Sequence, residues 1–289
     1  MLAEQLLGGF AIGCVYSLIA LGYTMLIRAI GLVNFAQGEV MMVGALIGWT
    51  LLTSFPLPYP LVLVLAMALT ALLGVLIDRL VYRPVQRRGA PTMNVIITTI
   101  GVSIALRNAA QLIWGSEPLR YPTVFATEPI AIGGLTVAPQ NVSILLVGLG
   151  FMGLLQLFFQ RTRTGLAMRA AAQDPDMARM MGVGVDRMVT YTYAISAALG
   201  AAGGVLLAPI FFASFDMGYI GVKSFAAATI GGLGNVPGAM VGGIVLGVVE
   251  TLGAAFISSA YKDALGYGIM IALLLFVPSG LFVRAQRRS

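Results

Sequence analysis

Long apolar stretches separated by short polar segments run through the whole of this 289-residue chain. Stretches of about 20 apolar residues are long enough to cross a hydrocarbon core of roughly 30 Å as helices. The pattern predicts eight such spans, at residues 6–27, about 38–53, 61–82, 92–114, 141–159, 188–208, 239–257 and 264–283. A transmembrane β-barrel would need alternating segments of about ten residues, which do not occur in the sequence.

One further apolar segment, residues 223–233, is too short to span the membrane and is interrupted by GGLGNVPG at residues 231–238. We therefore predict an all-α fold: a polytopic helical transmembrane protein with about eight full spans and a short broken or re-entrant helix. All 289 residues are expected to form a single transmembrane domain.

Positive charge gathers in the polar segments and predicts the orientation of the chain. Arg28, the segment DRLVYRPVQRRG at 78–89, residues 161–187 and the tail at 284–288 carry most of it. Cytoplasmic loops of membrane proteins are enriched in Lys and Arg. The N-terminal MLAEQ has no basic residue, so we expect the N-terminus outside and the C-terminus in the cytoplasm.

Composition excludes several other functions. The residues are 59% hydrophobic and 10% charged, and the net charge of +6 falls in loops, where topology explains it without a nucleic acid. With no histidine and one cysteine, disulfide frameworks and the usual zinc sites are excluded. GxSxG, HExxH and Walker A motifs are also absent, so we expect neither an enzyme nor a cofactor site, and ATP-driven work would need another subunit.

The longest polar island is residues 161–187, which we call the basic segment because it carries five arginines. Asp174-Pro175 reads as an N-cap followed by proline at the first helical position, and Gly182 supplies a stop. Residues 165–173 form a second candidate helix before it. A short capped basic element between two spans is more than a solvated loop needs, so the basic segment is interpreted as a docking surface.

Two interrupted segments resemble each other. Residues 31–34, GLVN, are followed by Gly38, and residues 232–235, GLGN, are followed by Gly238. Paired interruptions in two halves of a transporter point to its substrate path. Two ordinary loops that share a pattern by chance would look the same, so both interpretations stay open here.

Four polar residues fall within or near the predicted spans: Glu39, Arg107, Asn108 and Glu250. Because charge in hydrocarbon is costly, each is expected to face a cavity or a partner. Glu39 and Glu250 could instead sit near helix ends and reach the headgroups. Arg107 lies near the middle of its span and is either a member of a structural ion pair or a pathway residue.

Small residues also recur at four-residue spacing, at Gly44/Gly48, Gly200/Gly204 and Gly243/Gly247. Such pairs allow close approach of helices in a membrane. We interpret them as packing positions.

Four segments, in order along the chain, resemble the membrane permeases of branched-chain amino acid ABC importers. They are GLVNFAQGEVMMVGA at 31–45, DRLVYRPVQRRG at 78–89, TGLAMRAAAQDPDMARMMGV at 164–183 and AATIGGLGNVPGAMVGGIVLGVVE at 227–250. The chain is most similar to the shorter of the two permeases of that system. It departs from the pattern at Gln37, where relatives often have histidine, and at Asp78, where many have glutamate.

The resemblance implies an assembly in a bacterial inner membrane. A second permease, most simply making a heterodimer, would complete the path, with two ATP-binding subunits below, a periplasmic solute-binding protein above and membrane lipid around it. The basic segment then corresponds to the coupling loop on the ATPase, and the following positions carry over to it: Gly165, Arg169, Ala170, Asp174, Pro175, Ala178 and Gly182.

The same resemblance places the two interrupted segments along or behind the translocation path. The residues expected there are Asn34, Phe35, Gln37, Gly38, Glu39, Arg107, Gly234 and Asn235. A branched-chain amino acid is the expected substrate, although related permeases serve urea, short amides and other amino acids. The alternative from another class is an ion-coupled secondary transporter or channel for a small polar solute, which would need no ATPase.

Overall fold

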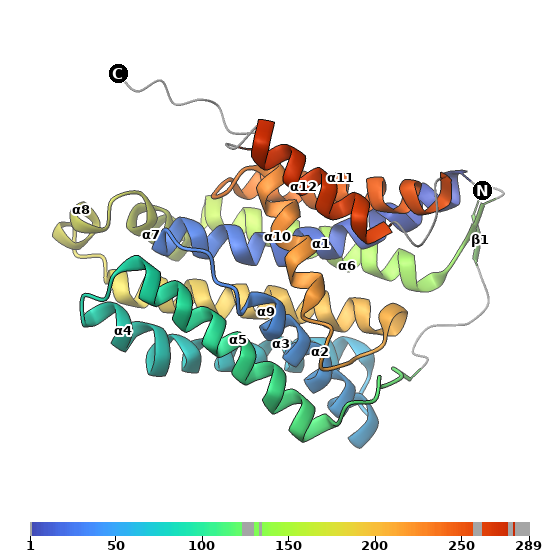
Figure 1. The fold of residues 1–289 in the computed structure, drawn as a ribbon, viewed down its shortest axis with the longest axis horizontal. Coiled ribbons are helices and arrows are strands. Elements are labelled where there is room, and N and C mark those ends of the chain that lie inside the picture. Colours follow the sequence, from blue (N-terminus) through green and yellow to red (C-terminus); the bar gives the residue numbers. More distant parts are fainter. Residues whose placement is uncertain (1, 123–129, 133–134, 257–261, 277–279, 281–289) are drawn as a thin grey trace.

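The computed structural model describes residues 2–122, 130–132, 135–256, 262–276 and 280, and its long helices form one bundle (Figure 1). The first half contains α1 (Leu2–Ile30), α2 (Gln37–Ser54), α3 (Tyr59–Ile77), the π-helical turn η1 (Asp78–Tyr82), α4 (Arg83–Arg87) and α5 (Thr92–Trp114). The second half contains α6 (Pro139–Arg161), α7 (Arg163–Gln173), α8 (Pro175–Met180), α9 (Val185–Phe211), α10 (Tyr219–Gly231), α11 (Val236–Phe256) and α12 (Lys262–Phe276). A short antiparallel hairpin pairs β1 (Ile130–Ile132) with β2 (Leu135–Val137).

The predicted all-α class is confirmed. Among the described residues, six helices are long and apolar enough to cross a membrane, namely α1, α3 with its extension through α4, α5, α6, α9 and α11. The predicted count of eight spans plus a short segment stays a prediction, because α2 is not among these six helices and residues 277–283 of the expected last span lie almost wholly outside the described part. The basic tail at 284–288 lies outside it as well.

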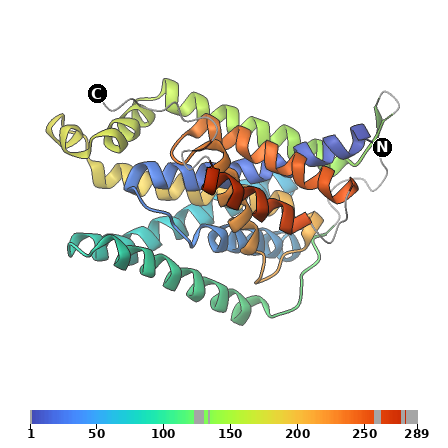
Figure 2. The same cartoon turned by 45° about the horizontal axis from the view of Figure 1, so that its top comes forward.

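Helix α1 forms the centre of the bundle. It is buried on all sides from Gly13 to Leu26, as expected for a helix that is apolar around its whole circumference. Helix α9 is the second central helix, because 67% of the residues in its 18-residue apolar stretch are buried. By contrast α3, α5 and α6 are largely unburied and expose leucines and isoleucines along their lengths. Figure 2 shows α5 and α6 at opposite edges of the bundle. Apolar surface of that extent suits contact with lipid acyl chains.

Small residues let the central helices approach closely, which confirms the interpretation of the glycine pairs. Helix α11 runs antiparallel to α1, and a Cβ added at Gly247 would overlap the backbone of Gly13. In the same interface the Ser17 hydroxyl donates to the Met240 carbonyl at 2.6 Å. Without a hydrophobic force between helices in lipid, such backbone approach is the main source of packing energy.

The two interrupted segments have similar local structure. In the first, the Asn34 side chain accepts from the Ala36 N–H at 3.1 Å, just before α2 begins. In the second, the Asn235 side chain accepts from the Gly238 N–H at 3.2 Å in the first turn of α11. The shared GLxN pattern thus reflects the same device, an asparagine that satisfies a free N–H at a helix start.

We call the interrupted segments at residues 31–38 and 232–238 the first and the second break. The first break lies inside the bundle. A Cβ at Gly22 of α1 would lie 2.6 Å from the Gln37 amide nitrogen. Gly22 precedes the end of α1 by eight residues, or about 12 Å at 1.5 Å per residue. The chain after α1 therefore folds back along it before α2 starts.

Helix α10 connects the two breaks. Figure 1 shows it running steeply across the direction of α1 and α9. Near its start, a Cβ at Gly221 would overlap Gly38 of the first break, and at its end a Cβ at Gly231 would overlap Gly238 of the second. The short segment predicted at 223–233 is thus a 13-residue helix that begins four residues earlier, at Tyr219, and has both ends clamped by glycine contacts.

Helices α7 and α8 lie together at one end of the bundle, away from the first residues of α1 (Figures 1 and 2). The basic connection at residues 78–89, which contains η1 and α4, packs against the start of α9. Asp78 of η1 accepts from the Thr190 hydroxyl of α9 at 2.8 Å and pairs with Arg83 at 3.2 Å. Arg83 also donates to the Asp186 carbonyl at 2.8 Å. These contacts join the end of α3 to the start of α9.

Candidate functional site

A cavity of about 380 Å³ lies where α2, α5 and α10 meet beside the first break. Three of the residues expected along the path line it, Phe35, Glu39 and Arg107. The rest of its polar wall comes from Ser103, Asp216, Tyr23 and Tyr219. Its apolar wall includes Val33, Ile100, Val222 and Phe225. We call this space the central cavity.

The Glu39 carboxyl group is held at the cavity by the start of α10. Glu39 lies in the first turn of α2 and is partly buried. Its carboxyl occupies the space that a side chain at Gly218 would fill. Its Oε2 atom is buried and receives no hydrogen bond from any described residue. The headgroup interpretation is therefore wrong for Glu39, because the side chain turns into the bundle.

Arg107 of α5 pairs with Asp216, in the connection between α9 and α10. Its guanidinium also lies 5.7 Å from the centre of the Phe215 ring. Both charged side chains are about half exposed, so the pair faces open space instead of protein interior. The sequence left the partner of Arg107 open, and Asp216, 109 residues away, is that partner.

The chemistry of the central cavity suits a small zwitterion with an apolar side chain. A guanidinium matches a carboxylate group in planar two-point geometry, and the carboxyl groups of Glu39 and Asp216 match an ammonium. The aromatic and aliphatic wall offers contact for a hydrocarbon side chain. Among the described residues that line the cavity, the charged ones are Glu39, Arg107 and Asp216.

Two other residues expected on the path are buried in a polar network instead. Gln37 and Ser196 of α9 exchange two hydrogen bonds of 3.0 Å, through the Gln37 amide and the serine hydroxyl and carbonyl. Asn34 accepts from the Tyr82 hydroxyl at 3.1 Å. Both side chains are almost fully inaccessible, so they hold the break in place and do not contact the cavity.

The remaining expected path residues are also separated from the central cavity. Gly38 packs against the backbone at Gly218, which fixes the crossing of α2 and α10. Gly234 has a left-handed backbone with φ of 86°, and Asn235 caps α11. The structure therefore brings the first break and Arg107 together, and leaves the second break at the other end of α10.

The local structure predicted for the basic segment is confirmed. The Asp174 side chain accepts from the N–H groups of Asp176 and Met177, at 3.1 and 2.9 Å, and Pro175 is the first residue of α8. Gly182 has φ of 82° and ends the turn after α8. Helix α7 covers the second predicted helix but starts at Arg163, where the Thr162 hydroxyl accepts from the Gly165 N–H.

The seven residues expected in the coupling loop have different surroundings. Gly165 packs against the backbone of Phe158 with no room for a side chain, and Ala178 is buried against Ala171. Ala170, Asp174, Pro175 and Gly182 are exposed. The exposed apolar side chains beside them, which the sequence analysis did not single out, are Leu166, Met177, Met180 and Met181.

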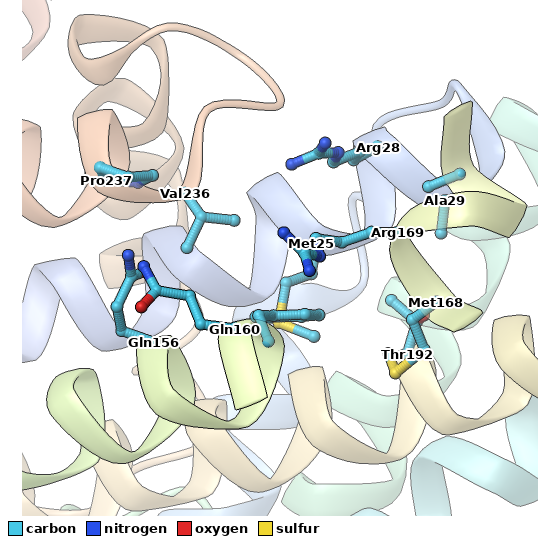
Figure 3. A pocket seen from close by; sticks show the side chains of 12 residues that line it. Met25, Arg28, Ala29, Gln156, Gln160, Met168, Arg169, Thr192, Val236 and Pro237 are labelled. Atoms are coloured by element: carbon cyan, nitrogen blue, oxygen red, sulfur yellow. The ribbon is translucent and has the colours of Figure 1, made fainter. Parts of the chain in front are cut away.

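Arg169 does not point outward from the basic segment. Figure 3 shows its side chain beside that of Arg28, at a second cavity between α1, α6, α7 and the start of α11. Its role at a docking surface would therefore be indirect. We call this second space the terminal cavity.

Sequence reasoning missed a buried ion pair. Lys223 of α10 and Glu250 of α11 lie with Nζ and Oε1 3.1 Å apart, and the Tyr16 hydroxyl donates to Oε2 of Glu250 at 2.9 Å. Glu250 is fully buried. The interpretation that it reaches headgroups is therefore wrong. The signal in the sequence was the charge itself, since a lone carboxylate in a span requires a partner.

Comparison with known proteins identifies the family. A sequence profile described as the permease component of branched-chain amino acid transport systems matches residues 5–275. The high-affinity branched-chain amino acid transport system permease protein BraD of Pseudomonas aeruginosa is 36% identical over 297 residues, covering 98% of this chain and 96% of that protein. The high-affinity branched-chain amino acid transport system permease protein LivH of Escherichia coli K12 is 34% identical over 299 residues, covering 98% of this chain and 96% of that protein.

A solved structure shares the fold. PsaBC from Streptococcus pneumoniae, in complex with Fab, superposes with a TM-score of 0.51 over 99% of this chain and 93% of that one, at 17% identity. The likeness supports the helical architecture alone. The match of the family over nearly the whole length, together with two relatives above 30% identity, shows that the chain belongs to the branched-chain amino acid transport system permease family.

Proposed function

We propose that this permease subunit forms one half of the translocation path of an ABC importer for branched-chain amino acids, and that the central cavity contacts the substrate in transit. The observation that carries the proposal is the grouping of Glu39, Arg107 and Asp216 beside an apolar wall. The relatives BraD and LivH are described as permeases of branched-chain amino acid systems, which supports this substrate class. Urea and short amides lack the opposite charges that this cavity matches.

Arg107 would hold the α-carboxylate and Glu39 the α-ammonium of the amino acid. Asp216 would keep Arg107 oriented between substrate molecules. The half-exposed state of the Arg107–Asp216 pair supports exchange, because such a pair gains little from its own attraction and can open at low cost. A branched aliphatic side chain would then lie against Phe35 and Phe225.

The basic segment would dock on an ATP-binding subunit. The support for this is geometric. Helices α7 and α8 are short, each has a side-chain cap at its first turn, and Gly165 packs α7 tightly against the end of α6. A push on α8 would therefore move the bundle as a rigid body. Exposed methionines on α8 offer an adaptable apolar contact, a property that suits a surface engaging a moving partner.

The complete assembly would contain a second permease as heterodimer partner, two ATP-binding subunits that hydrolyse ATP, and a periplasmic solute-binding protein. We propose a single domain over residues 1–289, in a bacterial inner membrane, with the N-terminus outside and the C-terminus in the cytoplasm. The basic segment would then lie on the cytoplasmic side, where its arginines follow the positive-inside rule.

Uptake of radiolabelled leucine into proteoliposomes holding the full assembly tests the proposal. We expect Arg107→Leu to assemble at normal yield and to lose ATP-driven uptake, because the side chain faces the central cavity. Asn108→Leu, at the next, exposed position of α5, serves as the matched control and is expected to transport normally. Loss of yield in Arg107→Leu would instead make the arginine structural.

The same preparation separates the importer from an ion-coupled transporter. Uptake should require both ATP and the ATP-binding subunits. Leucine uptake by this chain without them, driven by an ion gradient, would overturn the proposed mechanism and direct attention to Glu39 as an ion-coupling carboxylate.

A further inference from the structure

The terminal cavity has a volume of about 190 Å³ and lies at the end of the bundle that carries α7 and α8. It is bounded by the last turns of α1 and α6, by α7, and by the start of α11. Figure 3 shows the side chains of Arg28, Gln156, Gln160 and Arg169 around it. It is separate from the central cavity and shares no lining residue with it.

Two cations without an acidic partner face this cavity. Within the described part of the chain, neither Arg28 nor Arg169 forms an ion pair, and the cavity wall contains no carboxylate. Moreover, the Nε–H group of Arg169 is buried and donates to no acceptor in the described part of the chain. A buried guanidinium nitrogen without an acceptor is costly, and an anion in the cavity would relieve that cost.

The neutral lining narrows the kind of anion. Gln156 and Gln160 of α6 add amide donors on the side opposite Arg169. Thr192 of α9 also lines the cavity, but its hydroxyl donates to the Met188 carbonyl. The rest of the wall is apolar, with Met25, Phe159 and Val236 among its residues. Convergent guanidinium and amide donors above hydrocarbon suit the phosphate of an amphiphile, because phosphate accepts several charge-assisted bonds at once.

The place of the cavity favours a membrane lipid as the source of that phosphate. Helix α6 presents a leucine-rich outer face, including Leu154 and Leu157, that acyl chains would cover. Gln160 is exposed where that face ends, at the mouth of the cavity. Basic pockets between transmembrane helices at a membrane boundary bind anionic headgroups.

We propose that the terminal cavity binds the phosphate of an anionic phospholipid through Arg28 and Arg169. The lipid would hold α7 against α1 and α6, and so set the position of the element that docks on the ATPase. The inference concerns lipid binding itself and does not depend on which amino acid is transported.

Lipid retention by the assembled transporter tests this. The complex is reconstituted in phosphatidylcholine nanodiscs with increasing fractions of phosphatidylglycerol, and retained phosphatidylglycerol is counted by native mass spectrometry after transfer to detergent. We expect the double variant Arg28→Gln, Arg169→Gln to need about tenfold more phosphatidylglycerol for the same occupancy, as loss of a charged hydrogen bond implies.

Arg163→Gln is the matched control, because Arg163 is an exposed arginine of α7 outside the cavity. It should retain phosphatidylglycerol as the unmodified chain does. Equal retention by all three proteins would overturn the proposal. A parallel titration with inorganic phosphate in pure phosphatidylcholine distinguishes the source: saturable binding of phosphate, with no retained phosphatidylglycerol in any protein, would overturn the assignment to a lipid.

Discussion

Lys223 and Glu250 form an ion pair at 3.1 Å in which both side chains are at most 5% exposed. The pair joins α10 to α11, and the Tyr16 hydroxyl ties Glu250 to α1 as well. Gly266 of α12 lies beside Oε1 of Glu250. A Cβ at Gly266 would lie 2.6 Å from that atom, so glycine leaves room for the carboxylate. One buried carboxylate of α11 thus contacts three other helices, α1, α10 and α12.

Removing one partner of this pair should destabilise the protein strongly. Lys223→Met leaves the Glu250 carboxylate buried without its counter-charge, at a cost of about 3–5 kcal/mol. The double variant Lys223→Met, Glu250→Gln removes both charges and should recover much of that loss. Thermal unfolding in detergent, followed by circular dichroism, compares the single and double variants. A double variant no more stable than Lys223→Met would show that the pair does not determine stability here.

Helix α10 depends on glycine where it crosses the first break. Gly221→Ala should lower assembly and uptake, because the added methyl would overlap the backbone of Gly38 and push α10 away from the central cavity. Gly101→Ala on α5 is the matched control, since a Cβ at that position has nothing within 4 Å. Yield of the detergent-solubilised complex and leucine uptake are the measurements. Equal yields and uptake for both variants would contradict the tight crossing.

The local structure of the basic segment was predicted correctly from sequence. Asp174, Pro175 and Gly182 specify a short helix through contacts within eight residues. The two asparagines of the GLxN segments also act within three residues, although the sequence analysis did not interpret them as caps. Such contacts depend on neighbours in the chain, so a sequence pattern is enough to predict them.

The central cavity was predictable only in part, because its residues come from distant parts of the chain. Glu39 and Arg107 were singled out because charge in a span is costly, but their arrangement depends on Asp216 and Gly218, which come from the connection between α9 and α10. Asn34 and Gln37 belong to the same motif as Glu39 and turn away from the cavity, toward Tyr82 and Ser196. Which side of a broken helix a residue faces is set by tertiary packing, which the motif does not encode.

The connection between η1 and α9 contains one buried and one exposed ion pair, and the two should behave differently. Asp78→Ala should cost about 1–3 kcal/mol, because it removes a buried acceptor of the Arg83 guanidinium and the Thr190 hydroxyl. Arg87→Ala should change stability by at most about 1 kcal/mol, since both side chains of the Arg87–Asp186 pair are more than half exposed. Apparent melting temperatures in detergent at low and high salt measure both effects. A larger loss in Arg87→Ala than in Asp78→Ala would contradict this ranking.

The cap at the start of α8 offers the most direct test of the basic segment. Asp174→Ala leaves the N–H groups of Asp176 and Met177 without their acceptor and should cost about 1 kcal/mol of local helix stability. Because α8 lies at the end of the bundle and contributes little to the core, assembly should persist while substrate-stimulated ATP hydrolysis falls. Asp176→Ala is the control: it removes an equal charge two residues away, whose exposed pair with Arg179 supports no cap. ATPase rates of the two variants, with and without loaded binding protein, decide the matter, and normal stimulation in Asp174→Ala would refute the coupling role of α8.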